Sequence, residues 1–285
     1  MLIARSEWSG DMQPDELARL KGVKLAGWLK SVYGRKPAYS KFSTIEINEE
    51  VKVNDQIRLF LKKLVIDALF DLQLLEDAAE SLGWTRIKEM VRNKAAKGFR
   101  LQRGDFGEII TNAILEEIFG YLIPIPKLRY RIDSDQSLPG TDSIAVKWDG
   151  TSITEVCYVE TKTRSSSNSV VAVEGYKQLV SDFGKPSCEM TEFVLARLRD
   201  TNNKLFAPFL TYMKDRRQNT DLESLSLGLV WEVKTWSERC LLNLENTMNS
   251  SVPKLVVLLV RLAGLKELVK VTYDAIGVTE ISVEE

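Results

Sequence analysis

The chain has 285 residues, a net charge of −1 and no histidine. This length can bury a large core as one elaborated domain or as two, and 44% hydrophobic with 28% charged residues is the composition of a soluble globular protein. Without histidine, Ser-His-Asp and Cys-His catalysis and every histidine-ligated metal site are excluded. An active site must use carboxylates, hydroxyls, Lys, Arg or Cys, and oxygen ligands favour Mg²⁺ or Mn²⁺ over softer metals.

Cysteine usage and hydropathy predict a cytoplasmic protein with no membrane partner. Cys157, Cys188 and Cys240 are far apart and lack metal-ligand spacing, which fits a reducing compartment. The first residues lack the apolar run of a secretory signal. The most apolar segment, residues 255–265, contains Arg261 and is too short to span a bilayer.

The first hundred residues are expected to be mostly helical. A helix is predicted from Pro14 to about Tyr33, followed by a polar connection over residues 34–44. A longer helix is predicted over residues 54–81, where apolar residues recur at helical spacing. Such a stripe is typical of a core face, and its length also leaves room for a surface that docks a partner.

A basic stretch over residues 86–103 follows, with Glu89 as its single acid. It is either a solvated helix face or a surface that contacts nucleic-acid phosphates. Because the net charge is near zero, binding of nucleic acid would require a local patch of this kind. In that case affinity would fall steeply with salt, and the residues expected to contact the backbone are Arg92, Lys94, Lys97 and Arg100.

The rest of the chain mixes helices and strands. A helix is predicted from Gly104 to Gly120, with Asp105 as its N-cap and Glu108 in the capping-box position. Strands are predicted over residues 127–132, 143–148, 152–162, 192–198, 226–235 and 254–262. Further helices are predicted over residues 171–183, 202–217 and 237–249. Asp149-Gly150 joins two of the strands as a hairpin turn. This order predicts an α/β or α+β fold with a mixed sheet.

Two acids and a lysine are expected to converge at one edge of this sheet. Asp142 ends a Gly-Thr-Asp turn directly before one strand, and Glu160 and Lys162 lie on the next strand. Side chains two residues apart on a strand share a face, so Glu160 and Lys162 point the same way. Such a set can hold a hard divalent cation and polarise a phosphate.

Each of these residues also has a structural alternative. Glu108 can simply cap its own helix, and Asp142 can shape a turn. Glu160 and Lys162 can form a cross-face ion pair on an edge strand, and such pairs contribute only about 0–1 kcal/mol. A second Glu-x-Lys on a predicted strand, Glu232-Val233-Lys234, lacks the preceding acid-bearing helix and turn. We therefore favour the motif at residues 160–162.

The order of helix acid, Asp turn and Glu-x-Lys strand resembles the PD-(D/E)xK nuclease superfamily over about residues 100–200. The resemblance implies a restriction-endonuclease-like mixed sheet flanked by helices, with a helical N-terminal region. It implies that Asp142 is the central metal ligand, Glu160 the second ligand and Lys162 the catalytic lysine. Thr141 stands where the superfamily pattern has proline.

Three further site residues follow from the same resemblance. Glu108 is the helix acid and would hold a second or outer metal position. The carbonyl of Thr161 would be a further ligand of Mg²⁺ or Mn²⁺. Gln178 matches the glutamine of the following helix.

A narrower resemblance rests on the segments 103–108, Arg-Gly-Asp-Phe-Gly-Glu, and 160–164, Glu-Thr-Lys-Thr-Arg. With Asp142 between them, they resemble HamA, the nuclease-like subunit of Hachiman-type antiphage defence. This implies a metal-dependent DNase with DNA and a superfamily 2 helicase as partners. Residues 1–98 would form the partner-docking region and residues 99–285 the nuclease-like domain. The alternatives are a weakly active or inactive subunit that docks to and regulates the helicase, and an unrelated α/β interaction protein.

Overall fold

The computed structural model describes residues 25–32, 39–71, 74–75, 77–78, 84–131, 134, 140–183, 188–201, 203–215, 220–248 and 255–276. The strands are β1 (Leu29–Val32), β2 (Ser43–Glu49), β3 (Ser143–Trp148), β4 (Ile153–Arg164), β5 (Glu223–Glu232) and β6 (Leu255–Leu262). The α-helices are α2 (Asp55–Leu69), α4 (Trp84–Lys94), α5 (Phe99–Glu117), α6 (Val171–Phe183), α7 (Cys188–Asp200), α8 (Phe206–Asp215), α9 (Arg239–Thr247) and α10 (Leu265–Asp274). Short 3-10 helices are η1 (Leu25–Gly27), η2 (Lys127–Tyr130), η3 (Thr220–Leu222) and η4 (Val233–Thr235).

The strands form one mixed sheet in the order β1-β2-β6-β5-β4-β3. Strands β2, β6, β5 and β4 are parallel, whereas β1 and β3 are antiparallel strands at the two edges. Strand β5 is buried along nearly its whole length, as expected of a central parallel strand covered on both faces.

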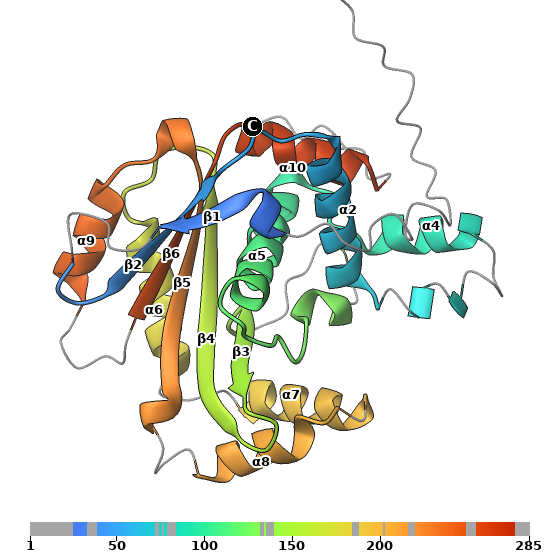
Figure 1. Ribbon diagram of the computed structural model, residues 1–285, viewed down its shortest axis with the longest axis vertical. Coiled ribbons are helices and arrows are strands. Elements are labelled where there is room, and N and C mark those ends of the chain that lie inside the picture. Colours follow the sequence, from blue (N-terminus) through green and yellow to red (C-terminus); the bar gives the residue numbers. More distant parts are fainter. Residues whose placement is uncertain are drawn as a thin grey trace, which may run out of the picture.

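Helices cover both faces of the sheet. Helices α2, α5 and α10 lie on one side of it, and α6 and α9 on the other (Figure 1). Alternate residues of β4 enter the two cores: Val159 packs with α5, and Tyr158 packs with the α6 side. Helices α7 and α8 lie together at the end of the molecule that carries the β3–β4 turn (Figure 1).

Two glycines allow α5 to approach the sheet closely. A Cβ atom on Gly107 would lie 1.7 Å from Oγ1 of Thr163, and one on Gly228 would lie 2.7 Å from Oγ1 of Thr111. A side chain at either position would push α5 away from β4 and β5. The glycine before Glu108 therefore fixes how far this acid stands from the strand that carries Glu160.

The structure confirms the predicted mixed α/β fold. It contains strands at residues 143–148, 153–164 and 255–262 and a helix at residues 171–183, close to the predicted bounds. Among the helices in the described ranges, none combines the length and the apolar character that a membrane span requires.

Several individual predictions were wrong. The region predicted as a strand at 127–132 contains a 3-10 helix, and the strand predicted at 192–198 lies within α7. Val194 and Leu198 are the buried residues there, and their four-residue spacing is helical. Helix α5 begins at Phe99, so Asp105 lies inside it and the predicted capping box is absent.

The N-terminal predictions need a further correction. The described end of the helix predicted at residues 14–33 is strand β1, and the remainder before residue 25 lies outside the described residues. Strand β2 pairs with β6, so the sheet includes residues on both sides of position 98. The helix predicted over 54–81 ends at Leu69. Helix α10 was not predicted.

Candidate active site

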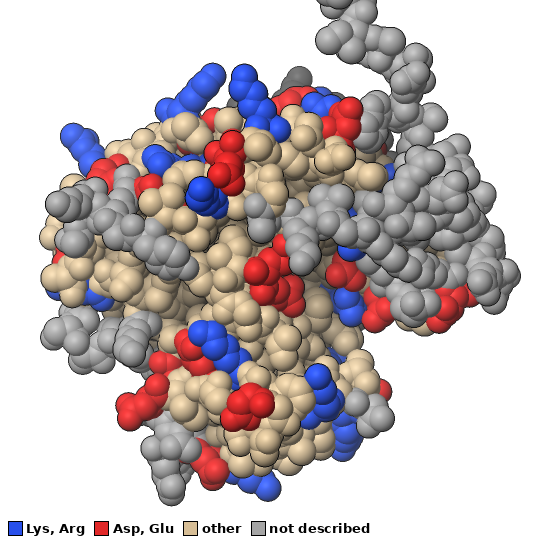
Figure 2. Space-filling model, in the orientation of Figure 1, with Lys and Arg blue, Asp and Glu red and all other residues tan. Residues whose placement is uncertain are grey.

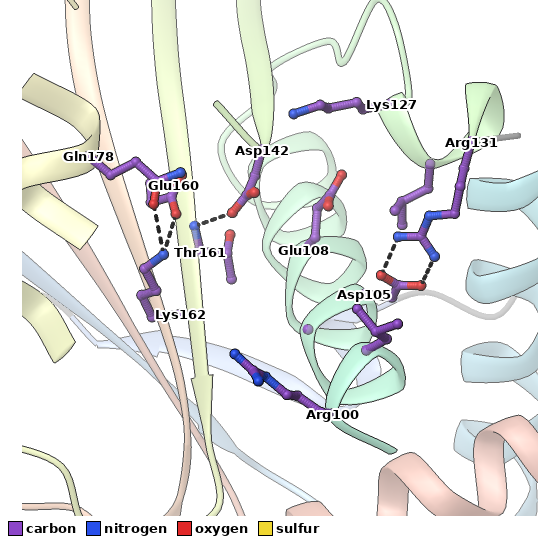
Figure 3. A pocket seen from close by; sticks show the side chains of 13 residues that line it. Arg100, Asp105, Glu108, Lys127, Arg131, Asp142, Glu160, Thr161, Lys162 and Gln178 are labelled. Atoms are coloured by element: carbon purple, nitrogen blue, oxygen red, sulfur yellow. Dashed lines mark hydrogen bonds and ion pairs between the residues drawn. The ribbon is translucent and has the colours of Figure 1, made fainter. Parts of the chain in front are cut away.

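The candidate site lies where β4 extends past its antiparallel neighbour. Ser143 of β3 pairs with Val159, so β3 offers no partner to β4 from Glu160 onward. A pocket of about 290 Å³ opens at this edge (Figure 3). Its lining is Arg100, Leu101, Gly104, Asp105, Glu108, Lys127, Leu128, Arg131, Asp142, Glu160, Thr161, Lys162 and Gln178.

Asp142 is fixed at the open edge of β4 by backbone contacts. Its Oδ2 accepts a hydrogen bond of 2.7 Å from the backbone N–H of Thr161. The preceding turn requires Gly140, which has a φ of 86° that other residues rarely adopt. Lys127 of η2 donates from Nζ to the carbonyls of Gly140 and Thr141 at 3.1 and 2.7 Å. The carboxylate is thus held from both the turn and the strand.

Glu160 and Lys162 lie on the same face of β4 and contact each other. Lys162 Nζ lies 2.6 Å from Oε1 of Glu160 and donates to Oε1 of Gln178, on α6, at 3.1 Å. Glu160 is only 1% exposed. Its second oxygen, Oε2, is buried without a hydrogen-bond partner. That oxygen is available to a ligand that enters the pocket.

Glu108 enters the pocket from α5 (Figure 3), near enough to Asp142 for the charge of Asp142 to act on its carboxylate. Its Oε1 is also buried without a hydrogen-bond partner. One turn earlier, Asp105 forms a buried bidentate salt bridge with Arg131, and both N···O distances are 2.6 Å. Asp105 therefore stiffens the packing of α5 against the segment after η2 and does not cap the helix.

Burial and neighbouring acids raise the pKa of both glutamates in the pocket. Burial and the nearby charge of Asp142 raise the pKa of Glu160 to about 7, although Lys162 and Lys127 oppose the shift. Burial, with the charges of Asp142 and Asp105, also raises the pKa of Glu108 well above its ordinary value. A cation bound among these carboxylates would offset both the cost of burying their negative charge and the repulsion between them.

The donor set fits a hard divalent cation, which prefers carboxylate and carbonyl oxygens. Asp142 and Glu160 could supply two carboxylates, and Thr161 could add its backbone carbonyl. In the part of the chain that the structure describes, no three Asp, Glu, His or Cys side chains form a ready metal-binding group. A bound ion would therefore need the backbone carbonyl, water or a shift of Glu108.

The predicted phosphate-contacting residues are only partly near this pocket. Of the four, Arg100 lines it. Arg92 and Lys97 are exposed. Lys94 donates to the carbonyl of Arg129 at 2.5 Å, so its ammonium is bound within the protein. On the face shown in Figure 2, the described acidic and basic side chains are interspersed.

Sequence reasoning missed Lys127 and Arg131. Both lie in the segment that was predicted to be a strand, and both have side chains that are largely buried. Their spacing of four residues would place them on one face of a strand or of a helix alike, so it gave no sign of a site. Basic residues beside a proline-rich turn carried no signal that could have assigned them to the site.

The competing motif at Glu232 has a structural role. Its carboxylate accepts hydrogen bonds from the backbone N–H groups of Gly264 and Leu265, at 3.3 and 2.7 Å. Glu232 thus caps the N-terminus of α10. Lys234 lies in η4, beyond the end of β5, so the two residues do not share a strand face.

A mixed sheet with helices on both faces, and acids and a lysine converging at its open edge, defines a nuclease-like α/β protein. The family model for HamA matches residues 28–276. The chain therefore belongs to the HamA family, which associates it with Hachiman-type defence and confirms the narrower of the two resemblances. No curated protein matches the chain.

Proposed function

We propose that this protein is a metal-dependent deoxyribonuclease of the PD-(D/E)xK type and the effector of a cytoplasmic defence complex. The observation that carries the proposal is the meeting of Asp142, Glu160 and Lys162 at the unpaired edge of β4. The unpartnered oxygens of Glu108 and Glu160 support it, because buried carboxylate oxygens normally have partners.

The residues of the pocket would have different roles in the reaction. Asp142, Glu160 and the Thr161 carbonyl would hold Mg²⁺ or Mn²⁺, and Glu108 would hold a second or outer position. When bound, the ion supplies the positive charge that lowers the pKa of an attacking water and offsets charge on the phosphate. Lys162 donates a hydrogen bond to that water or to a phosphate oxygen. Its positive charge stabilises the charge that develops during hydrolysis.

Gln178 and the basic residues have supporting roles in the proposal. Gln178 accepts a hydrogen bond from Lys162 and so orients the ammonium towards the pocket. Arg100 at the pocket, with the exposed Arg92 and Lys97, would contact backbone phosphates. Lys94 would join them only after leaving its contact with the Arg129 carbonyl.

Control by a partner helicase is part of the proposal. A nuclease that is active at all times would damage the DNA of its own cell. The ion pair between Glu160 and Lys162 occupies one oxygen of the expected metal ligand. A partner that alters this pocket could therefore set the activity.

A second candidate function is a subunit of the same fold that docks to and regulates the helicase without cleaving DNA. The ion pair with Lys162 favours it, because it already neutralises one oxygen of the Glu160 carboxylate that would bind the metal. The two functions differ in one measurable property, which is metal-dependent hydrolysis.

The test is nicking of supercoiled plasmid with Mg²⁺ or with EDTA, using the full chain alone and together with its helicase. Asp142→Asn and Glu160→Gln should each abolish nicking, whereas Asp200→Asn, at an exposed helix end, should not. Full activity in either of the first two variants would exclude this site. Failure of the parent protein to nick under all conditions, with retained co-purification of the helicase, would favour the second candidate.

A further inference from the structure

Three arginines gather beyond Lys162, at the end of β4. Arg164 is the last residue of β4, and Arg100 and Arg103 lie in the first turns of α5. Arg100 lines the pocket and points from α5 towards β4 (Figure 3). Arg103 donates to Oγ of Ser165, directly after β4, at 3.1 Å. The two arginines of α5 therefore face the end of the strand that carries Glu160.

Among the described residues, these three guanidinium groups are only weakly ion-paired. Glu174 approaches Arg164 only at 3.9 Å. Within the described ranges, Arg100 and Arg103 form no salt bridge. Burial, together with the charges of Arg164 and Arg100, lowers the pKa of Arg103. Positive charges that lie near one another repel, and an anionic ligand would offset that repulsion.

The side chains are also held in place. Arg103 lies over the ring of Phe99, with 5.7 Å between its guanidinium carbon and the ring centroid. Arg164 donates from Nη1 to the carbonyl of Thr163 at 3.0 Å. Guanidinium groups fixed in this way are preorganised to donate in pairs to phosphate oxygens.

We infer that Arg100, Arg103 and Arg164 form a second phosphate-binding site, which holds a nucleic-acid backbone phosphate other than the one cleaved. Arg164 lies four residues beyond Glu160 on β4, roughly 13 Å at about 3.3 Å per residue. Arg103 and Arg164 are not among the residues that line the pocket of Glu160, so a phosphate bound by this pair differs from one bound at the acids. That this phosphate belongs to the substrate strand rests on the proposed function, whereas the binding of phosphate by the arginines does not.

Salt-dependent DNA binding tests the inference without cleavage. The full chain carrying Glu160→Gln is titrated, in EDTA, with a fluorescein-labelled DNA duplex and with its single strand at several NaCl concentrations. Adding Arg103→Gln and Arg164→Gln should weaken binding roughly tenfold. The slope of log Kd against log salt should fall by about 0.7–0.9, the contribution of one phosphate.

The matched control removes the same charge elsewhere. Arg199→Gln with Lys214→Gln changes two exposed residues on α7 and α8, at the opposite end of the molecule from the start of α5 (Figure 1). This pair should leave affinity and slope as in the parent. Arg103→Lys with Arg164→Lys keeps both charges but loses the planar fork. This double Lys variant should keep most of the salt-dependence slope while binding DNA more weakly. It remains informative if the double Gln variant fails to fold.

Equal affinity and slope for the parent and the arginine variants would overturn the inference, as would a parent that binds no DNA at low salt. The binding assay contains no chemistry. A parent that fails to nick plasmid therefore refutes the proposed function and leaves this result standing.

Discussion

The buried ammonium of Lys127 donates to the carbonyl oxygen of Thr141 at 2.7 Å. This contact ties η2, which follows α5, to the turn that carries Asp142. Lys127 is 6% exposed, so its charge is also felt by the carboxylates of the pocket. It opposes the upward pKa shifts of both Glu108 and Glu160. Lys127 is thus a positioning residue that acts through Asp142 and through the charge of the site.

Lys127→Met should impair the site, although the two side chains are similar in volume and the packing should change little. The two carbonyls of the turn lose their donor, and the acids lose a compensating charge. We expect a 10–100-fold loss in Mg²⁺ affinity or cleavage rate, the usual effect of removing a group that orients a metal ligand. The measurement is the Mg²⁺ concentration for half-maximal cleavage. Lys147→Met, which removes a half-exposed ion pair with Glu155, is the control; an unchanged Mg²⁺ requirement in Lys127→Met would exclude the positioning role.

Glu108→Gln should stabilise the metal-free protein at neutral and higher pH. The pKa of Glu108 is raised well above its ordinary value of 4.5, first by burial and then by Asp142 and Asp105. As pH rises, Glu108 therefore ionises in the unfolded chain before it ionises in the folded protein. The stability that Glu108 contributes is present below about pH 4.5 and is lost as pH rises through its folded-state pKa. We expect a Tm gain of at least about 3 °C at pH 8 and little gain at pH 4.

Mg²⁺ provides the second readout for this variant. Added Mg²⁺ should raise the Tm of the parent at pH 8 more than at pH 6, because protons compete with the ion for Glu160 and Glu108. Glu108→Gln should reduce that Mg²⁺ effect. Glu192→Gln changes an exposed acid on α7 and should alter neither quantity. A parent whose metal-free Tm rises steadily from pH 5 to pH 8, with no difference from Glu108→Gln, would contradict the prediction.

The strands around the site could be predicted from local pattern. Asp149-Gly150 separates two alternating segments, and Gly150 adopts the φ of 103° that a tight hairpin turn requires. The shared face of Glu160 and Lys162 follows from the period of a strand. The segment 192–198 could not be assigned in the same way, because a short apolar run does not distinguish a strand from a helix.

The contacts that orient the site could not be predicted from spacing. Asp105 pairs with Arg131, and Asp142 accepts from Thr161, across loops whose paths depend on the packing of α5 against the sheet. Helix α5 begins with Gly98 at its cap position and no side-chain cap. The start of the helix therefore had no sequence signature, and Asp105 was taken for the cap.

Glu232→Ala tests which of the two Glu-x-Lys motifs is catalytic. Removing the carboxylate leaves the first N–H groups of α10 without their acceptor. We expect a loss of about 1 kcal/mol in the free energy of unfolding, as for other helix N-caps, with an unchanged cleavage rate well below the Tm. Thermal denaturation and plasmid nicking measure the two effects. Loss of nicking in folded Glu232→Ala, with normal nicking in Glu160→Gln, would show that the wrong motif was chosen.

Lys162→Ala should slow the chemical step while leaving DNA binding nearly unchanged. The ammonium is 2.6 Å from Glu160 and 3.1 Å from Gln178, within the pocket and on the face of the expected metal ligands. One stabiliser of developing charge contributes roughly 10²–10³-fold in rate. Single-turnover cleavage at saturating DNA isolates this effect from affinity. Gln178→Ala removes only the residue that orients the ammonium, so it should cause a smaller loss in the same assay. If Lys162→Ala cleaves bound DNA at the parent rate, Lys162 serves only to neutralise Glu160, and the charge that stabilises the reaction must come from another residue of the pocket.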